Sequence, residues 1–146
     1  MKKLFLALFL VIPALVGAQT DQKPSISETM TWLNGRLAFG LGVARAEFVE
    51  KNCGLCFYTK TGVTGTCVHL ANIDPEQISA GDNGSGGRKF NLVAKPGLHA
   101  GTSTNKNGVA TNASHFDFEF RPEANSNTFD QDMIGALKML VSHCSK

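Results

Sequence analysis

The feature that most constrains the fold lies near the end of the chain, where an alternating segment precedes a helical one. Residues 115–121 read His-Phe-Asp-Phe-Glu-Phe-Arg, so that aromatic and polar side chains alternate. Because successive side chains of a strand point to opposite faces, Phe116, Phe118 and Phe120 share one face and the polar residues share the other. The segment therefore predicts a strand in a sheet with one apolar face and one solvent-exposed face.

The next segment predicts a helix that begins after Thr128 and ends near Cys144. Thr128 as N-cap and Gln131 three residues later form a capping-box pattern. Apolar residues then recur at spacings of three and four, which places them on one stripe. These residues are Phe129, Met133, Ala136, Leu137, Leu140, Val141 and Cys144. Such a stripe needs an apolar partner surface, and the upstream phenylalanines are the nearest one in the sequence.

A second capping-box pattern, Ser25 with Glu28, predicts an N-terminal helix over residues 26–38. Trp32 lies beside the centre of the apolar stripe of this helix. We interpret Trp32 as a flank of the core, because large aromatic side chains are usually mostly buried. The alternative is an exposed binding residue.

Between the helices, short apolar runs separated by glycines are typical of an antiparallel sheet. The predicted strands are residues 46–51, 55–60, 66–71 and 88–94. Residues 72–78 predict a tight turn or a single helical turn, and the glycine tract at 81–87 predicts a flexible loop. Residues 96–114 are rich in Gly, Thr, Ser and Asn and predict either a long surface loop or a weak edge hairpin.

Residues 1–18 have the pattern of a secretory signal peptide, with two lysines, an apolar run over residues 4–15 and small residues before the expected cleavage site. A membrane-spanning helix is the alternative, but Pro13 interrupts the run, which is shorter than the roughly 20 residues that a span needs. We expect a mature protein of residues 19–146 that forms one domain, without a membrane anchor, in the periplasm or outside the cell.

Cleavage would remove two of the 14 Lys and Arg residues and leave 12 basic against 12 acidic residues. A net charge near zero gives no electrostatic attraction to nucleic acid or to an anionic membrane surface. Neither is therefore expected as a partner.

The chain has four cysteines, Cys53, Cys56, Cys67 and Cys144. In an oxidising compartment an even number of cysteines favours disulfides over free thiols. Three pairings are open: Cys53–Cys56 with Cys67–Cys144, or either of the two arrangements with longer bridges. The alternatives to disulfides are a zinc site built from Cys53, Cys56, Cys67 and His69 or Cys144, and a redox-active Cys53–Cys56 pair.

His115 and Asp117 share the polar face of the predicted strand with Glu119 and Arg121. They are close enough for a hydrogen bond or a shared ion, but mixed charges are also expected on any solvated strand face, and we favour that interpretation. The chain contains no nucleophile elbow or zinc-protease motif. We therefore predict no catalytic residues and no cofactor.

A helix, several short strands and a closing helix indicate an α+β fold, in which the last helix covers a small curved antiparallel sheet or partial barrel. In this order, and in residues 28–37, 68–75, 116–120 and 136–144, the chain resembles the pleckstrin-homology-like (PH-like) domains of bacteria. The resemblance implies a sheet of about seven strands plugged by the C-terminal helix, and a role in binding rather than catalysis.

The first functional hypothesis is an exported, non-enzymatic domain that binds a protein or peptide partner through an exposed sheet edge and residues 96–114. The second is a small zinc- or thiol-dependent enzyme that uses Cys53 and Cys56 with His69 or His115. The third is an inhibitor or immunity-type partner of another exported protein. The state of the four sulfur atoms separates the second hypothesis from the other two.

Overall fold

The computed structural model describes residues 23–36, 43–59, 64–104, 108–120 and 128–146. The helices and strands of this part are α1 (Ile26–Asn34), β1 (Val43–Val49), β2 (Gly54–Thr59), β3 (Thr64–His69), β4 (Ser79–Asp82), β5 (Arg88–Val93), β6 (Gly101–Thr104), β7 (Ala110–Ala113), β8 (His115–Phe120) and α2 (Phe129–Cys144). The strands form two antiparallel sheets that do not close, one in the order β1-β2-β3-β6-β7 and one in the order β4-β5-β8. The predicted α+β class is confirmed, and the sheets are consistent with a small curved sheet.

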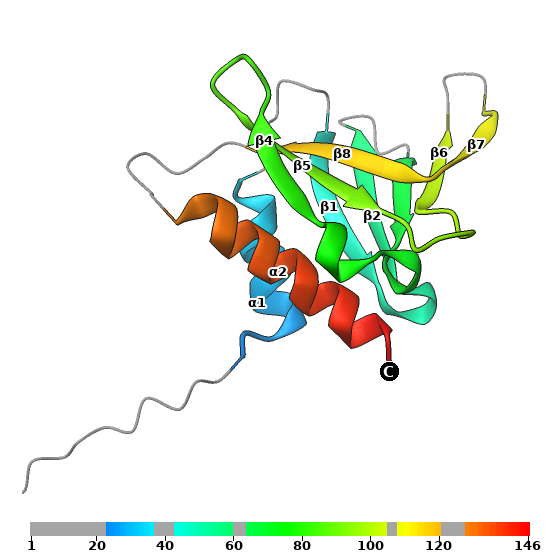
Figure 1. Ribbon diagram of the computed structural model, residues 1–146, viewed down its shortest axis with the longest axis horizontal. Helices are drawn as coiled ribbons and strands as arrows, with labels where there is room; N and C mark the ends of the chain where they lie inside the picture. Colours follow the sequence, from blue (N-terminus) through cyan, green and yellow to red (C-terminus); the bar gives the residue numbers. More distant parts are fainter. Residues whose placement is uncertain (1–22, 37–42, 60–63, 105–107, 121–127) are drawn as a thin grey trace, which may run out of the picture.

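The two sheets are the two halves of one bent antiparallel meander. Ile73 bridges Ala94, and the Asp74 N–H donates to the Val93 carbonyl oxygen over 2.9 Å, so that the β3–β6 pairing continues into the β4–β5 pairing. The Ala94 N–H donates to the Ser114 carbonyl oxygen over 2.8 Å, at the junction of β7 and β8. Across the bend, β3 is thus followed by β4, β5 by β6 and β7 by β8, so that each pair contributes one strand to each sheet (Figure 1).

Two backbones come very close at this bend. Gly101, the first residue of β6, lies opposite Val68 of β3. A Cβ atom at position 101 would overlap the carbonyl oxygen of Cys67 and come within 2.8 Å of the Val68 Cα. Glycine is required here because any side chain would push β6 away from β3.

The core lies between the two sheets and α2. Phe57 of β2 stacks on Phe118 of β8, with ring centroids 4.1 Å apart, and so joins the two sheets. Phe90 and Leu92 of β5 are fully buried beside them. The predicted strand faces are confirmed for the residues described: Phe118 is buried, whereas Asp117 is exposed. The side chain of Phe120 and the whole of Arg121 lie outside the described residues.

Helix α2 packs against α1, β4 and two short 3-10 turns, η3 (Leu70–Asn72) and η4 (Pro75–Gln77). Its predicted stripe is confirmed, because Met133, Leu137 and Leu140 are fully buried. Phe129 meets Phe90 edge-on, with ring centroids 6.0 Å apart. The closing helix therefore does cover the phenylalanine side of the sheet, and it also covers the turns at the bend.

The two predicted capping boxes have different outcomes. The box of α1 is confirmed: the Glu28 N–H donates to the Ser25 hydroxyl over 3.2 Å, and the Ser25 N–H donates to the Glu28 carboxylate over 2.7 Å. The box of α2 is wrong, because the Thr128 hydroxyl donates to the Asp132 carboxylate over 2.8 Å and makes no bond to the helix backbone. A charged acceptor one position beyond Gln131 forms the stronger hydrogen bond.

The predicted end of the first helix is also wrong. Helix α1 ends at Asn34, where Gly35 is the C-cap, rather than continuing to residue 38. Residues 37 and 38 themselves lie outside the described residues. At this end the Asn34 side chain bonds both the Met30 carbonyl oxygen of its own helix and the backbone of β1.

The five predicted strands correspond to β1, β2, β3, β5 and β8, with ends that differ by at most three residues. Sequence analysis missed β4, which begins before the glycine tract, and left β6 and β7 open between a loop and a hairpin. The structure has the hairpin, with Gly101 opposite Ala113. Residues 72–78 contain the single helical turn η4, as one of the two alternatives predicted, and η3 ends where this segment begins.

Candidate functional site

All four cysteines form disulfides, one between Cys53 and Cys144 and one between Cys56 and Cys67. This pairing is one of the two longer-range arrangements that the sequence left open, and the Cys53–Cys56 pairing is wrong. Cys56 lies directly opposite Cys67 on neighbouring strands, whereas Cys53 precedes β2 and reaches the last turn of α2. The predicted disulfides are confirmed, and they fit an oxidising location outside the cytoplasm.

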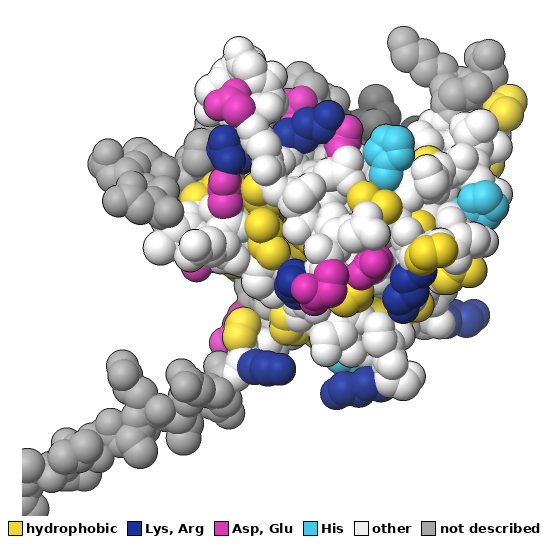
Figure 2. All heavy atoms as spheres, in the orientation of Figure 1, with side chains coloured by type: hydrophobic (Ala, Val, Ile, Leu, Met, Phe, Trp, Pro, Cys, Tyr) yellow, Lys and Arg dark blue, Asp and Glu magenta, His cyan; other side chains and the backbone are white. Residues whose placement is uncertain are grey.

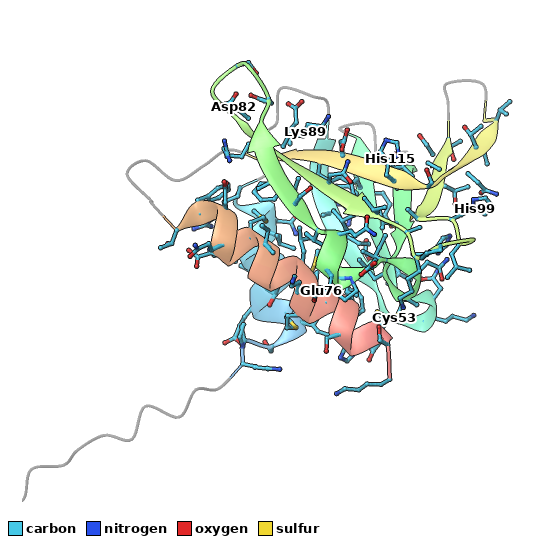
Figure 3. The ribbon with its side chains drawn as sticks, in the orientation of Figure 1. Cys53, Glu76, Asp82, Lys89, His99 and His115 are labelled. Atoms are coloured by element: carbon cyan, nitrogen blue, oxygen red, sulfur yellow. A yellow bond between two sulfur atoms is a disulfide. The ribbon has the colours of Figure 1, made fainter. Side chains whose placement is uncertain are left out.

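These disulfides change what the candidate zinc ligands can do. A cysteine in a disulfide has no thiolate to give to a metal, so His69 would be left without the partners predicted for it. Among the described residues, no three His, Cys, Asp or Glu side chains lie together in a way that could hold a metal ion. Figure 3 shows that His99, His115 and Cys53 lie at separate places on the surface.

His115 and Asp117 also do not form a shared site. Asp117 accepts a hydrogen bond from Asn91 over 2.8 Å and pairs with Lys89 over 2.6 Å, both on the neighbouring strand β5. His115 lies 3.5 Å from the Ser114 hydroxyl. In Figure 2, acidic and basic side chains are mixed over the β4–β5 hairpin and the outer face of this sheet. The arrangement is that of a solvated strand face with mixed charges.

A strong ion pair joins this sheet to the start of α2. The Arg88 guanidinium bonds both carboxylate oxygens of Asp130, with the Nε–Oδ1 bond at 2.9 Å, and a second carboxylate, Asp82, lies 3.9 Å away. The hydrogen bond to Asp130 raises the pKa of Arg88 above its ordinary value. Asp130 is also favourably placed in the first turn of the helix, at the positive end of its dipole.

Strand β8 has an open edge. The Ala94–Ser114 bond fixes which backbone groups of β8 face β5, because bonded and non-bonded pairs alternate along an antiparallel ladder. The N–H and C=O groups of His115, Asp117 and Glu119 consequently point away from β5. No backbone hydrogen bond joins them to any other residue in the described part of the chain. We call this row of backbone groups the β8 edge.

At the edge of β1, one side chain pairs the outward-facing backbone groups of Ala46. Asn34, the last residue of α1, donates from Nδ2 to the Ala46 carbonyl oxygen over 2.9 Å. The Ala46 N–H donates in return to Asn34 Oδ1 over 2.6 Å. The amide of Asn34 thus takes the place of a neighbouring strand and satisfies the outward-facing groups of Ala46, which is buried.

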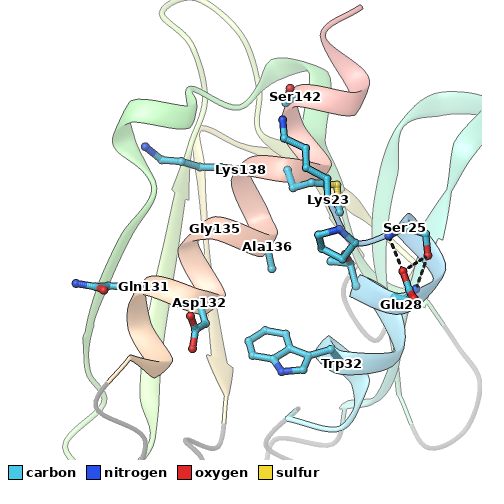
Figure 4. Close-up of a pocket in the computed structure, with 13 residues that line it drawn as sticks. Lys23, Ser25, Glu28, Trp32, Gln131, Asp132, Gly135, Ala136, Lys138 and Ser142 are labelled. Carbon is cyan, nitrogen blue, oxygen red and sulfur yellow. Dashed lines mark hydrogen bonds between the residues drawn. The ribbon is translucent and has the colours of Figure 1, made fainter. Parts of the chain in front are cut away.

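A groove runs between α1 and α2, with a volume of about 1270 Å³. Figure 4 shows Trp32 and Asp132 at one end of it and Lys23 and Ser142 at the other. Trp32 is half-buried: its ring contacts Phe129 with centroids 6.3 Å apart, and the Arg36 guanidinium lies 4.4 Å above it. Trp32 therefore fits the favoured prediction, a flank of the core, and it also lines the groove.

Two groove residues have no structural explanation in the fold. Gly135 lies in the interior of α2, yet a Cβ built on it would meet no described atom within 4 Å. Thr29 of α1 is 3% exposed, and its hydroxyl has no hydrogen-bond partner. Sequence analysis missed both residues. A glycine inside a helical repeat was the available signal, because it destabilises a helix unless something requires it.

Comparison of the chain with family models, with curated proteins and with solved structures found no match. Neither of the two described helices is long and apolar enough to cross a lipid bilayer. The chemistry of the described surfaces therefore has to support any functional proposal.

Proposed function

We propose that this protein is an exported, non-enzymatic domain that binds a protein or peptide partner by strand addition at the β8 edge. The observation that carries the proposal is the unpaired row of N–H and C=O groups of His115, Asp117 and Glu119. An extended peptide beside them would form a regular ladder and extend the three-stranded sheet by one strand.

Within the described residues, the β8 edge lacks several of the devices that usually protect an edge strand. Residues 110–120 contain no Pro and no Gly, and the strand register of β8 has no bulge. Charged side chains often guard an edge, but here they are held inward: Asp117 bonds Lys89 and Asn91, and Glu119 accepts from Asn83 over 3.0 Å. The carboxylates are thus tied to the sheet and leave the outward backbone groups accessible.

Export is part of the same proposal, with residues 1–18 as a cleaved leader. The two disulfides support an oxidising compartment. We also propose that the fold is related to the PH-like domains, with the bent meander in the place of their sheet and α2 in the place of their C-terminal helix. An inhibitor or immunity-type role is the case in which the partner is another exported protein.

A pair of substitutions at position 117 tests the proposal. Asp117→Pro removes an outward N–H and no ladder bond, so we expect the sheet to persist while strand addition is lost. Asp117→Ala removes the same ion pair and keeps the N–H, which makes it the matched control. Partners would be captured from the envelope and culture medium of the source cells with each purified variant.

The expected result is a partner that binds the wild-type and Asp117→Ala proteins and not the Asp117→Pro protein. Amide hydrogen exchange should then show new protection at His115, Asp117 and Glu119 in the complex. A captured partner that binds all three proteins equally, with no change in exchange along β8, would exclude strand addition at this edge.

A further inference from the structure

The α1–α2 groove contains a glycine for which the described part of the chain gives no reason. Gly135 is exposed and helical, and the space where its side chain would be is open. Glycine in a helix interior is less favourable than alanine, by up to about 1 kcal/mol, unless packing requires it. A partner that passes close to the backbone of α2 at this point would supply that requirement.

An orphaned hydroxyl lies on the opposite wall. Thr29 lines the groove from α1, is almost completely buried, and has no acceptor or donor for its Oγ1. A buried polar group without a partner destabilises the protein, so such groups usually have a role. The flexible side chain of Met139 also lines the groove.

The walls of the groove favour a helix over an extended segment. Both walls are helices, whose interior backbone groups are already hydrogen-bonded, so the walls cannot pair with an extended peptide. A helix satisfies its own backbone and needs only a surface for its apolar face. Trp32, Ala136 and Met139 supply apolar contacts along the groove.

The charged side chains around the groove indicate the direction in which a bound helix would lie. Lys23 and Lys138 lie towards the C-terminal half of α2, and Asp132 lies near its start (Figure 4). Glu28 also lines the groove, but its carboxylate is held by the backbone and hydroxyl of Ser25. Among the described residues, Lys138 pairs with the exposed Glu76, 3.4 Å away, and such a surface pair is weak. Acidic side chains stabilise the first turn of a helix and basic ones its last turn. A complementary helix would therefore place its first turn at the lysines.

We propose that the α1–α2 groove binds one amphipathic helix of a partner protein, antiparallel to α2, with acidic residues in its first turn and basic residues in its last turn. A small gap over Gly135 accepts one side chain of this helix, in the manner of ridges packed into grooves. The groove and the β8 edge are separate surfaces, so this inference goes beyond the proposed strand addition and does not depend on it.

A displayed library of 16-residue helices, the length of α2, tests the inference. Every member carries the same apolar stripe, and the polar positions of its first and last turns are randomised. We expect selection on the purified protein to enrich acidic first turns and basic last turns. A synthetic peptide from the selection, and its copy with the two charged turns exchanged, then serve as probes.

Substitutions in the groove give the quantitative readout. Gly135→Gln should raise the Kd of the selected peptide by about tenfold or more, which corresponds to about 1.4 kcal/mol. The same variant should unfold at a higher temperature than the wild type, so that lost binding cannot be attributed to lost folding. Ser27→Gln, at an exposed position of α1 outside the groove, is the matched control and should leave the Kd unchanged.

A charge-reversed variant tests the orientation of the bound helix in the groove. The double substitution Lys23→Glu and Lys138→Glu should weaken binding of the selected peptide and strengthen binding of the copy with exchanged turns. The inference is overturned if no helix is enriched, or if the selected helices show no preference for acidic first turns and basic last turns. It is also overturned if the Gly135→Gln variant binds the selected peptide with the Kd of the wild type. It is equally overturned if Asp117→Pro abolishes peptide binding, because the peptide would then occupy the β8 edge.

Discussion

The two outer edges of the meander are treated in opposite ways. At β1, the helix that precedes the strand ends on Asn34, whose amide pairs with both backbone groups of Ala46. At β8, the equivalent outward groups of His115, Asp117 and Glu119 have no such neighbour within the described residues. The end of α1 therefore pairs an outward-facing residue of β1, whereas the outward groups of β8 stay unpaired within the described residues.

This difference separates structural from functional surface. An unpaired edge promotes aggregation, and proteins usually cover or interrupt it. Covering β1 shows that the fold can protect an edge with a single amide side chain. The absence of a comparable side chain along the described part of β8 is then better explained by a use for that edge than by a lack of means.

The first prediction concerns the disulfide that fastens α2 to the part of the chain that follows β1. The Cys53–Cys144 disulfide joins residues 91 apart and ties α2 to the turn after β1. Replacing both cysteines by serine should lower the free energy of unfolding by roughly 4 to 5 kcal/mol, because a long loop is released in the unfolded chain. Urea denaturation measures the loss.

The second disulfide is the matched control for this experiment. Cys56 and Cys67 are only 11 residues apart, so the corresponding double serine variant should lose about 3 kcal/mol. Binding at the β8 edge should persist in the variant without Cys53 and Cys144. Equal losses for the two variants would show that the long bridge does not fasten the helical layer as described.

The second prediction opens the closed edge. Asn34→Leu keeps the side-chain size but leaves the N–H and C=O groups of the buried Ala46 without partners. The free energy of unfolding should fall by roughly 2 to 4 kcal/mol, since each unsatisfied group is unfavourable in the interior. Analytical ultracentrifugation should also show self-association through the exposed β1 edge. A monomer of unchanged stability would contradict the role assigned to Asn34.

The alternating strand and the helical stripe at the end of the chain were predictable because each has a simple period. Phe118 and Leu137 are buried as expected from the periods of two and of three to four residues. The cysteine pairing was not predictable, because Cys53 and Cys144 meet only after the meander has bent. The spacing of the four cysteines in the sequence left all three pairings open.

The surfaces of functional interest were harder to predict for the same reason. The sequence pointed to a sheet edge but could not say which one, because Asn34 closes the β1 edge through a contact with Ala46, twelve residues away. Strand β4 was missed since its four residues, Ser79–Asp82, have no apolar alternation of their own. The groove depends on the packing of α1 against α2, which no local pattern specifies.

The third prediction compares the same substitution on the two edges. Ala46→Pro removes an N–H that donates to Asn34, so it should lower the free energy of unfolding by about 2 to 3 kcal/mol. Asp117→Pro removes an outward N–H and one surface ion pair, so its loss should stay below about 1 kcal/mol. Thermal unfolding of both variants and of Asp117→Ala measures the difference. Similar losses at both positions would mean that the β8 edge is not open.

The smallest expected effect concerns the start of the helix that closes the β1 edge. The backbone and side chain of Ser25 hydrogen-bond the Glu28 carboxylate and lower its pKa below the ordinary value of 4.5. Since a lowered pKa favours the charged form in the folded state, this contribution is complete above pH 4.5. It is lost as the pH falls through the lowered value. Wild type should therefore be slightly more stable than Glu28→Gln at neutral pH.

This small difference in stability should disappear in acid, and its effect on hydrogen exchange should be confined to the start of α1. Hydrogen exchange of the first turn of α1 should rise below pH 4.5 in the wild type, after correction for the intrinsic pH dependence of exchange, towards the rate of Glu28→Gln. The amides of Phe116 and Phe118, which face β5, should not respond, because no bond of the capping box reaches β8. A pH-independent difference between the two proteins would show that the Glu28 charge does not stabilise the start of α1.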